Sequence, residues 1–396
     1  MIRGNLSEIF KTCSQLPIVA LVTGGRTGSD FFQSLTDGHP EILQLTGICW
    51  FHDDFWEKAV CKSSLNDLVN ELIYRDWMIS KFKSLYNVQE RWDKLGKKKN
   101  ESFCVSISKF KRTIIKILEN QEINSKNVFI ACHMAYSIAR GESLREKKLL
   151  FVHIHHIRRL PFLINDFNDA KVIFTTRDPR NNWISGLEHH RDYSGAYGAA
   201  HVYSWLSRVY CEATPICKLV SVEKIKLVVL EDLHLKSKEV LTEFCDDFSL
   251  NFEECLLEST YHDKQWWGDA LSKKYLEGFN KNIRNPKWFD KMFFYENYTF
   301  EFLFRSRFER YGYDFYSRTY RLGFIGYFII PFFIILPLKY ELDAFGYDLS
   351  KAKRVKGKVK SIAKSIIFYL LRILLQFKWL LIKLMDSEKK LRKYIQ

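Results

Sequence analysis

The stretch that decides the fold is IVALVTGGRTGSDFFQSLTDGHPEIL, residues 18–43. It opens with an apolar run rich in β-branched side chains, which is typical of a buried strand. The turn Gly24-Gly25-Arg26-Thr27-Gly28-Ser29 follows, and then a segment with helical character. A strand that leads through a glycine-rich turn into a helix points several backbone N–H groups at one place, which favours a phosphate. The sequence therefore predicts a site for a phosphate-bearing ligand.

Short apolar runs recur along the chain and alternate with longer amphipathic stretches. The runs that we predict as buried strands are 17–23, 127–132, 149–155, 171–176 and 225–230. The helical stretches between them include 61–92, 104–121 and 181–212, and residues 93–101 are expected to form a surface loop. Strands without clean polar alternation suit a parallel sheet that is covered on both faces. We therefore expect an α/β fold with three layers, a P-loop-like parallel sheet flanked by helices, and a mainly helical region over 232–316.

The net charge of +15 is concentrated at the C-terminal end. Residues 351–396 contain 14 Lys or Arg and 2 acidic residues, so they carry +12 and leave only +3 for residues 1–350. A nearly neutral body argues against nucleic acid as a partner. A basic tail favours an anionic membrane surface. The 27% of charged residues also excludes a polytopic membrane protein and a disordered chain.

Two appendages are predicted after a globular domain that spans residues 1–316. The first, residues 317–350, contains the uncharged run 323–338. Its 16 residues would span about 24 Å as a helix, short of the ~30 Å hydrocarbon core. Two prolines weaken a spanning helix further. We expect a re-entrant or interfacial segment, with a hairpin buried against the body as the alternative.

The second appendage, residues 351–396, contains a basic amphipathic helix predicted over 358–385. At 100° per residue, its polar side chains fall on one side and its apolar side chains on the other. The polar side includes Lys360, Lys364, Arg372, Gln376, Lys378 and Lys383. This profile is typical of a helix that lies in a membrane interface. The alternative is a helix packed on the body or in a dimer.

The glycine-rich turn departs from the Walker A pattern, which needs a lysine directly after its last glycine. Gly28 is followed by Ser29, and the cation comes earlier, at Arg26. The longer string is more specific than a glycine-rich turn, because R-x-G-S is followed by Asp37 and then by His39-Pro40. It resembles the 5′-phosphosulfate loop of sulfotransferases of the carbohydrate and bacterial type. These enzymes use 3′-phosphoadenosine 5′-phosphosulfate.

A second motif carries the same resemblance. Residues 171–180, KVIFTTRDPR, read as a strand that ends in a basic turn, and Ser185 lies eight residues after Arg177. This string is similar to the family's 3′-phosphate motif. A guanidinium binds phosphate through two parallel hydrogen bonds, and a serine hydroxyl can donate to the same oxygens. Without the loop, R-D-P could instead be a helix start capped by Asp178, with an exposed arginine.

The resemblance covers about residues 16–316 and implies a set of binding residues. The cofactor-binding residues that it implies are Gly25, Arg26, Thr27, Gly28, Ser29, Arg177 and Ser185. The backbone N–H groups of residues 25–29 and the Ser29 hydroxyl would hold the 5′-phosphosulfate. Arg177 and Ser185 would hold the 3′-phosphate. Arg26 would also stabilise the bridging oxygen as the bond to sulfur breaks, which makes it a catalytic candidate.

Sulfuryl transfer also needs a base that takes the proton of the acceptor hydroxyl. Tyrosylprotein-type relatives place a glutamate soon after the H-P pair, but residues 45–47 contain no carboxylate. Cytosolic members use a histidine on the strand before the 3′-phosphate strand. This chain has FVHIHH at 151–156, and the family's spacing to Lys171 selects His155 as the catalytic base. A neutral imidazole with a pKa near ~6.5 suits this role.

Several alternatives to this base remain open. Strand alternation would place His153 on the same face as His155, with His156 pointing away. His155 could also be a hydrogen-bonded core histidine. The runner-up bases are His52, Asp53, Asp54 and His133. We expect no metal, because carboxylates at metal-site spacing are absent near the H-x-H-H motif and the transfer needs none.

Asp30 departs from the family pattern, which usually has a second Ser or Thr at this position. A carboxylate there could repel the cofactor. We expect it instead to orient Arg26 or to stabilise the helix N-terminus through the dipole. It remains the main residue that speaks against a functional cofactor loop.

These observations predict a sulfotransferase that moves a sulfuryl group from 3′-phosphoadenosine 5′-phosphosulfate to a hydroxyl of a glycan, glycolipid or amphipathic metabolite. One alternative is a P-loop nucleotide kinase or NTPase, which the missing Walker lysine opposes. The other is a non-catalytic membrane-associated protein with a degenerate nucleotide fold, which Asp30 favours. The nine cysteines without a C-x-x-C pair, and an N-terminus without an apolar run, lead us to expect a cytoplasmic protein at the cytosolic face of a membrane.

Overall fold

The computed structural model describes residues 6–59, 64–194, 197–270, 275–316, 323–384 and 392–393. The chain divides into two compact units. Unit 1 contains the described residues of Met1–Thr175 and Ile216–Ile283, and unit 2 those of Thr176–Pro215 and Arg284–Lys393. The eight cysteines among the described residues are free thiols.

The centre of unit 1 is a sheet whose strands lie in the order β2-β3-β1-β4-β5. These strands are β1 (Ile18–Thr23), β2 (Ile42–Gln44), β3 (Leu149–His156), β4 (Lys171–Thr176) and β5 (Ile225–Val229). β1 pairs in parallel with both β3 and β4, so that Val19 lies opposite Phe151 on one side and Lys171 on the other. β2 pairs in parallel with β3. The glycine-rich turn therefore leaves the carboxyl end of a central strand.

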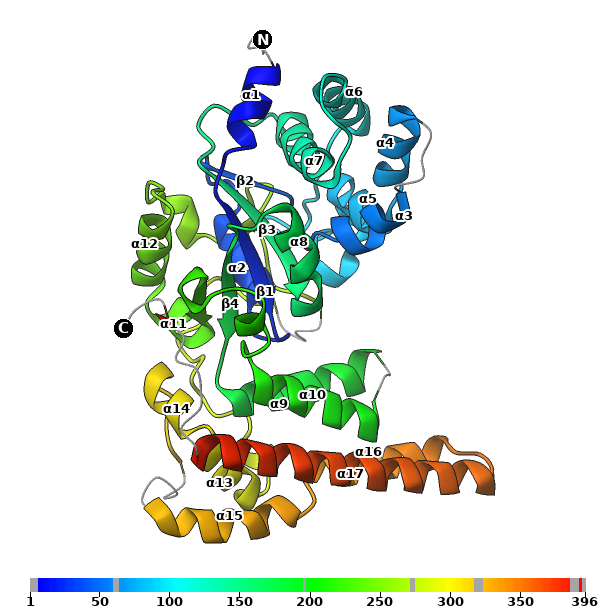
Figure 1. The fold of residues 1–396 in the computed structure, drawn as a ribbon, viewed down its shortest axis with the longest axis vertical. Helices are drawn as coiled ribbons and strands as arrows, with labels where there is room; N and C mark the ends of the chain where they lie inside the picture. The colour runs from blue at the N-terminus through cyan, green and yellow to red at the C-terminus, as the bar shows by residue number, and fades with distance from the viewer. Residues whose placement is uncertain are drawn as a thin grey trace. The chain divides into compact units, whose positions relative to one another are not determined.

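Helices cover both faces of this sheet, which gives three layers (Figure 1). Figure 1 shows α11 and α12 on one side and α7 and α8 on the other. Val19, Leu21 and Phe151 of the sheet join Phe32 of α2 and Phe244 of α12 in one buried cluster. Every residue of β1 is buried. The predicted α/β fold, a parallel sheet flanked by helices, is confirmed.

The other helices and strands of unit 1 surround this core. The helices are α1 (Leu6–Cys13), α2 (Ser29–Thr36), α3 (Glu57–Ala59), α4 (Leu65–Ile73), α5 (Asp76–Phe82), α6 (Ile107–Leu118), α7 (Ser125–Arg140), α8 (Leu160–Asp166), α11 (Leu230–Leu235) and α12 (Ser237–Asp247). A short antiparallel hairpin joins β6 (Thr260–Tyr261) and β7 (Lys264–Gln265). Residues 93–101 form turns and isolated bridges without helix or strand, as expected.

Two expectations about secondary structure are wrong. The run 127–132 is not a strand but the middle of α7, whose residues 128–138 are all buried. A helix that is buried on every side shows an unbroken apolar run, which periodicity cannot separate from a buried strand. The region 232–316 is helical only at its two ends. The described residues 248–270 and 275–293 are mostly irregular, apart from short helical turns and the β6–β7 hairpin.

Unit 2 is helical and is organised around the buried side chain of Arg180. Its elements are α9 (Pro179–His189), α10 (Ala199–Cys211), α13 (Phe294–Leu303), α14 (Arg305–Tyr311), α15 (Gly326–Ile335), α16 (Lys339–Lys351), α17 (Val355–Leu384) and the two-residue β8 (Arg392–Lys393). The Arg180 guanidinium forms ion pairs with Asp178 at 2.7 Å and with Glu301 at 2.7 Å. It also lies over the Trp288 ring, 4.3 Å from its centroid. Charge pairing and ring contact together compensate its complete burial.

The two predicted appendages are both helical within the described residues. Gly323–Lys351 and Val355–Leu384 are long and apolar enough to cross a membrane by length and composition, with mean hydropathies of 1.7 and 1.8 over an 18-residue window of each. The first of these is interrupted at 336–338, so it comprises α15 and α16. α17 confirms the helix that was predicted over 358–385, up to Leu384. Residues 317–322 and 385–391 lie outside the described residues.

Candidate active site

The predicted phosphate-binding turn links β1 to α2 and adopts an unusual backbone. Gly25, Arg26 and Gly28 have φ angles of 98°, 56° and 84°. Successive residues with left-handed and right-handed angles curl the backbone so that its N–H groups face one concave side, which binds anions in other proteins. The glycines adopt these angles without steric cost, whereas Arg26 is strained. The strain sits at the residue that the sequence selects as the catalytic cation.

Three threonine hydroxyls hold the base of this turn. The hydroxyl oxygens of Thr23 and Thr27 lie 2.5 Å apart, and those of Thr27 and Thr175 lie 2.7 Å apart. The Gly25 N–H donates to the Thr23 hydroxyl at 2.9 Å. A phosphate would therefore share this N–H with Thr23, in contrast to the expectation that Gly25 is available. The buried Thr27 thus links the turn to β1 and β4 through its hydroxyl. The turn ends at Ser29, where α2 begins.

Gly28 leaves no room for a side chain. A Cβ at this position would lie 2.3 Å from Cδ1 of Leu230, the first residue of α11. The close approach of α11 and the positive φ together demand glycine here. The sequence pattern therefore reflects packing as well as ligand binding.

Arg26 is paired with Asp269 and not with Asp30. Its Nη1 lies 2.8 Å from Oδ2 of Asp269, and the two side chains are 26% and 18% exposed. The charges of Asp30 and Arg26 attract each other, and Asp30 lies in the first turn of α2, where it can stabilise the helix N-terminus. Burial, with the charges of Asp30 and Asp269 nearby, raises the pKa of Glu90 well above its ordinary value. The arginine thus lies among three carboxyl groups, at least one of which tends to be neutral.

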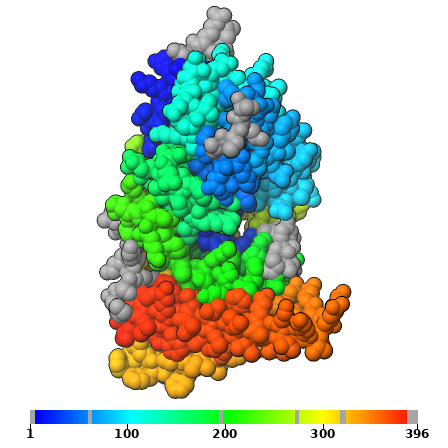
Figure 2. All heavy atoms as spheres, turned by 45° about the vertical axis from the view of Figure 1, so that its right-hand side comes forward, coloured from blue at the N-terminus to red at the C-terminus, as the bar shows by residue number. Residues whose placement is uncertain are grey.

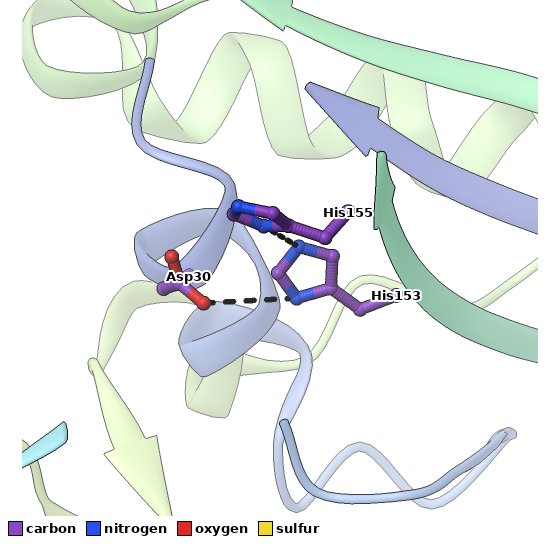
Figure 3. A group of neighbouring side chains, drawn as sticks. All are labelled: Asp30, His153 and His155. Atoms are coloured by element: carbon purple, nitrogen blue, oxygen red, sulfur yellow. Dashed lines mark hydrogen bonds and ion pairs between the residues drawn. The ribbon is translucent and has the colours of Figure 1, made fainter. Parts of the chain in front are cut away.

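Asp30, His153 and His155 lie together beside this turn (Figure 3). Asp30 is in the first turn of α2, and both histidines are on β3. Oδ1 of Asp30 lies 3.7 Å from Nδ1 of His153, and Nε2 of His153 lies 3.2 Å from Nδ1 of His155. His153 Nδ1 also forms a hydrogen bond of 2.9 Å with Oε1 of Gln33. A chain of polar contacts therefore runs from α2 to the carboxyl end of β3.

His155 sits at an irregularity of β3. The register against β1 shifts between Leu21 and Val22, and His155 has a φ of 62°. The simple alternation expected for this strand does not hold here, because the ring of His156 lies only 4.8 Å from that of His155. A left-handed histidine at a bulge is a strained residue, and such strain is frequent at functional sites.

Burial lowers the pKa of His155 to about 3, while the nearby Asp30 opposes this shift. Burial also lowers the pKa of His153 to about 3. The pKa near 6.5 that was expected for His155 is therefore wrong. Burial conversely raises the pKa of Asp30, because its charged form is desolvated. Both imidazoles are neutral at physiological pH, so each can accept a proton.

The sequence has no carboxylate at metal-site spacing near the H-x-H-H motif, but the fold brings Asp30 to it. The potential ligand atoms of Asp30, His153 and His155 all lie within 4.8 Å of one another, which is close enough to hold a metal ion. Sequence spacing could not show this, because Asp30 precedes His153 by more than a hundred residues and reaches it through the β1–β3 pairing. In the structure, however, the two nitrogens of His153 face different partners instead of a common centre.

The alternative bases are engaged elsewhere. His52 pairs with Asp166 at 3.0 Å, Asp53 with Arg159 at 2.6 Å, and Asp54 with Lys58 at 2.8 Å. His133 is fully buried in α7, and its Nδ1 contacts the Phe129 carbonyl at 2.9 Å. These contacts give each residue a structural role.

The second predicted motif lies in unit 2. Asp178 caps α9 by accepting a hydrogen bond of 2.8 Å from the Arg180 N–H. The capping role that the sequence allows is confirmed, but Arg177 is buried and not exposed as that alternative required. Ser185 is half-buried in α9. The last arginine of the motif, Arg180, is structural.

Sequence reasoning did not select Gln33, Glu90 or Asp269 for this site. Gln33 lies on α2 one turn after Ser29, within the motif itself, and a helical wheel could have placed it beside Asp30. Glu90 and Asp269 come from irregular segments far along the chain and carry no local signal. Only the folded chain brings them to Arg26.

Among known proteins, only solved structures match this chain. No family model matches the chain, and no curated protein matches it. One similar structure is the sulfotransferase domain of the Synechococcus PCC 7002 olefin synthase, with 17% identity and a TM-score of 0.34 over 69% of this chain and 86% of that one. Another is the sulfotransferase domain of the curacin biosynthetic pathway, with 16% identity and a TM-score of 0.39 over 66% and 84%. Both are sulfotransferase domains, the family that the sequence motifs resemble.

Proposed function

We propose that the protein is a sulfotransferase that uses 3′-phosphoadenosine 5′-phosphosulfate and a hydroxyl acceptor. The observation that carries this proposal is the strained turn after β1, which lies beside a neutral histidine chain at the end of β3. When bound, the donor supplies an activated sulfuryl group. The chain must then hold two phosphate groups, accept one proton and stabilise the leaving oxygen.

The donor set of the turn fits a phosphosulfate. It offers backbone N–H groups, the hydroxyl of Ser29 and the guanidinium of Arg26, all of which favour anionic oxygens. The carboxyl groups nearby oppose an anion less than their number suggests, because burial favours the neutral forms of Asp30 and Glu90. Arg177 and Ser185 are proposed to hold the 3′-phosphate.

His155 is proposed to take the proton of the acceptor hydroxyl. The acceptor oxygen forms a bond to sulfur while the bond between sulfur and the bridging oxygen breaks, and Arg26 stabilises the negative charge that develops there. The proton moves to the neutral imidazole of His155. The leaving product is adenosine 3′,5′-bisphosphate.

For the acceptor, we propose a glycan, glycolipid or amphipathic metabolite at the cytosolic face of a membrane. The basic tail and the two apolar helical stretches of unit 2 support a membrane location. A lipid-linked hydroxyl would then be the acceptor within reach.

Binding of adenosine 3′,5′-bisphosphate tests this function directly. We expect calorimetry to show binding to the full chain, and the change Arg177→Ala to weaken it about tenfold or more, because a charge-assisted bidentate contact is lost. Arg158→Ala, which removes an exposed arginine of unit 1, serves as the matched control. Absence of binding would contradict the proposal, and binding of ATP alone would favour a nucleotide kinase or NTPase.

A further inference from the structure

The surface formed by α15 and α17 has the polarity of a lipid-facing surface. α17 packs against α10, α15 and α16, all within unit 2. The residues of α17 that are buried in this packing are Arg372, Gln376, Trp379 and Leu380. A surface helix of a water-soluble protein turns its apolar side inward. Here two of the polar residues face inward instead.

The inward polar residues are fully satisfied by protein partners. Arg372 donates to the carbonyl of Leu336 at 3.0 Å and forms an ion pair with Glu341 at 2.9 Å. It also donates to the Ile334 carbonyl, so that it closes the C-terminal end of α15. Gln376 donates to the Tyr210 hydroxyl at 2.7 Å. These contacts dock α17 onto unit 2 along its polar side.

The outward side of α17 carries many apolar side chains, with exposed lysines among them, most of them in its first turns. Its exposed apolar residues are Val355, Val359, Ile362, Ile366, Ile367, Leu370, Leu374, Leu381 and Leu384, and Leu374 is 64% exposed. α15 adds Phe328, Phe332 and Ile335, with Phe332 at 71%. The two helices lie side by side in unit 2 (Figure 2). The two packed helices thus expose many large apolar side chains, which is a mark of an interaction surface.

Lysines lie within this face and along its edge. At ~100° per residue, Lys356, Lys360 and Lys378 fall on the same side of α17 as Leu374, and Lys364 falls at the edge of that side; all four are exposed. Long lysine side chains lie along apolar surface while their ammonium groups reach an anionic layer. A second protein chain would offer no general reason for such lysines, whereas anionic lipid headgroups do.

We infer that the face formed by α15 and α17 inserts into the headgroup and acyl boundary of an anionic membrane, with both helices lying in the membrane plane. Lying in the plane leaves the polar side of α17 on unit 2 and the apolar side in lipid. A single spanning helix would instead bring Arg372 into hydrocarbon without Glu341. This inference concerns unit 2 and is independent of the transfer reaction.

Flotation of the full chain with vesicles tests the inference. We expect the protein to float with vesicles of phosphatidylcholine containing about one third phosphatidylserine, and less with phosphatidylcholine alone. The double change Leu370→Gln and Leu374→Gln should weaken vesicle binding about tenfold or more, because the apolar area that enters lipid is reduced. The double change Leu85→Gln and Ile123→Gln removes two exposed aliphatic side chains of unit 1 and should leave binding unchanged.

Two results would overturn the inference. One is a wild-type chain that stays with the soluble fraction in both vesicle preparations. The other is equal flotation of the two double variants. A dimer that dissociates only in the Leu370→Gln and Leu374→Gln variant, without vesicle binding, would assign the face to a second copy of the chain.

A separate observation concerns the hydrogen-bond chain at His155. The amide nitrogen of Gln33 donates to the carbonyls of Leu45 and Gly47, at 2.9 and 3.3 Å. Its amide oxygen therefore faces Nδ1 of His153, at 2.9 Å. An amide oxygen only accepts, so the His153 proton is on Nδ1. Nε2 of His153 is then the acceptor for a proton on Nδ1 of His155.

We propose that Gln33 is a positioning residue that fixes the tautomers of both histidines and leaves the lone pair of His155 on Nε2. Its importance for catalysis rests on the proposed transfer function. The tautomers do not depend on that function, so the tautomer proposal and the transfer proposal can fail separately. The alternative is a metal ion bound between Asp30, His153 and His155. A metal ion would need an unprotonated nitrogen of each histidine that points at one common centre.

The nitrogen shifts of labelled histidine in the wild type and in Gln33→Met test this proposal. We expect Nδ1–H forms for His153 and His155 in the wild type, and loss of this pattern in Gln33→Met, with a fall of about tenfold or more in kcat and little change in KM. An Nε2–H form of His155 in the wild type, or equimolar zinc chloride that binds and shifts both rings, would overturn it.

Discussion

Replacing His155 by alanine is expected to lower the rate of sulfuryl transfer by about 10²–10⁴-fold while the protein stays folded. The imidazole is proposed as the base, and it ends a hydrogen-bond chain in which its Nδ1 lies 3.2 Å from Nε2 of His153. The rate is measured as radiolabelled sulfate moved from the donor to the glycolipids of a membrane extract. Binding of adenosine 3′,5′-bisphosphate should be nearly unchanged, which separates loss of the base from loss of the donor site.

His156→Ala is the matched control for this change. It removes the next imidazole of β3, whose ring lies 4.8 Å from that of His155. We expect it to retain activity within about threefold. Equal losses in the two variants, or near-normal transfer by His155→Ala, would show that His155 is not the base.

The dependence of kcat/KM on pH follows from the same residue. A base acts only while it is unprotonated, and burial lowers the pKa of His155 to about 3. We therefore expect kcat/KM to stay level as pH falls from 7 to about 5, where an exposed histidine of pKa ~6.5 would already be mostly protonated. Stability behaves differently, because the unfolded chain gains protons below ~6.5 that buried His153 and His155 do not bind until about pH 3. Acid thus weakens the fold within this window.

The fold could be predicted from the sequence wherever a hydrophobic pattern is compatible with only one kind of secondary structure. The runs that became β1, β3, β4 and β5 are flanked by turn signals and are too short for helices. The run 127–132 is compatible with a buried strand or with a buried helix. In the structure it belongs to a helix of 16 residues, which is capped by Asn124 and Gly141. β2 has only three residues, too few for a recognisable strand pattern in the sequence.

The candidate site divides in the same way. Gly25, Arg26, Gly28 and Ser29 are adjacent in sequence, so a local motif describes them. The sequence shows Asp30 as a departure from the family pattern, but it does not show that Asp30 lies beside His153, because His153 belongs to the distant strand β3. The pKa of His155 was also beyond the sequence, since it depends on burial at a strand bulge that no residue pattern announces.

Replacing Arg26 by alanine is expected to lower transfer by about 10²–10³-fold. The guanidinium belongs to the turn that is proposed to hold the phosphosulfate, and its loss would remove stabilisation of the charge that develops on the leaving oxygen. Unlike His155→Ala, this change should also weaken binding of the bisphosphate, because Arg26 contacts the ligand in the ground state. Calorimetry and the radiolabel assay measure the two effects separately.

The partner Asp269 makes this prediction specific. Arg26→Ala removes the ion pair with Asp269, whose side chain is 18% exposed in the wild type, so some loss of stability accompanies the loss of activity. Asp269→Asn breaks the same ion pair but keeps the guanidinium. If Arg26 acts on the leaving oxygen, Asp269→Asn retains transfer within about tenfold while Arg26→Ala does not. If the ion pair merely holds the turn together, both variants lose activity alike, and Arg26 is then structural.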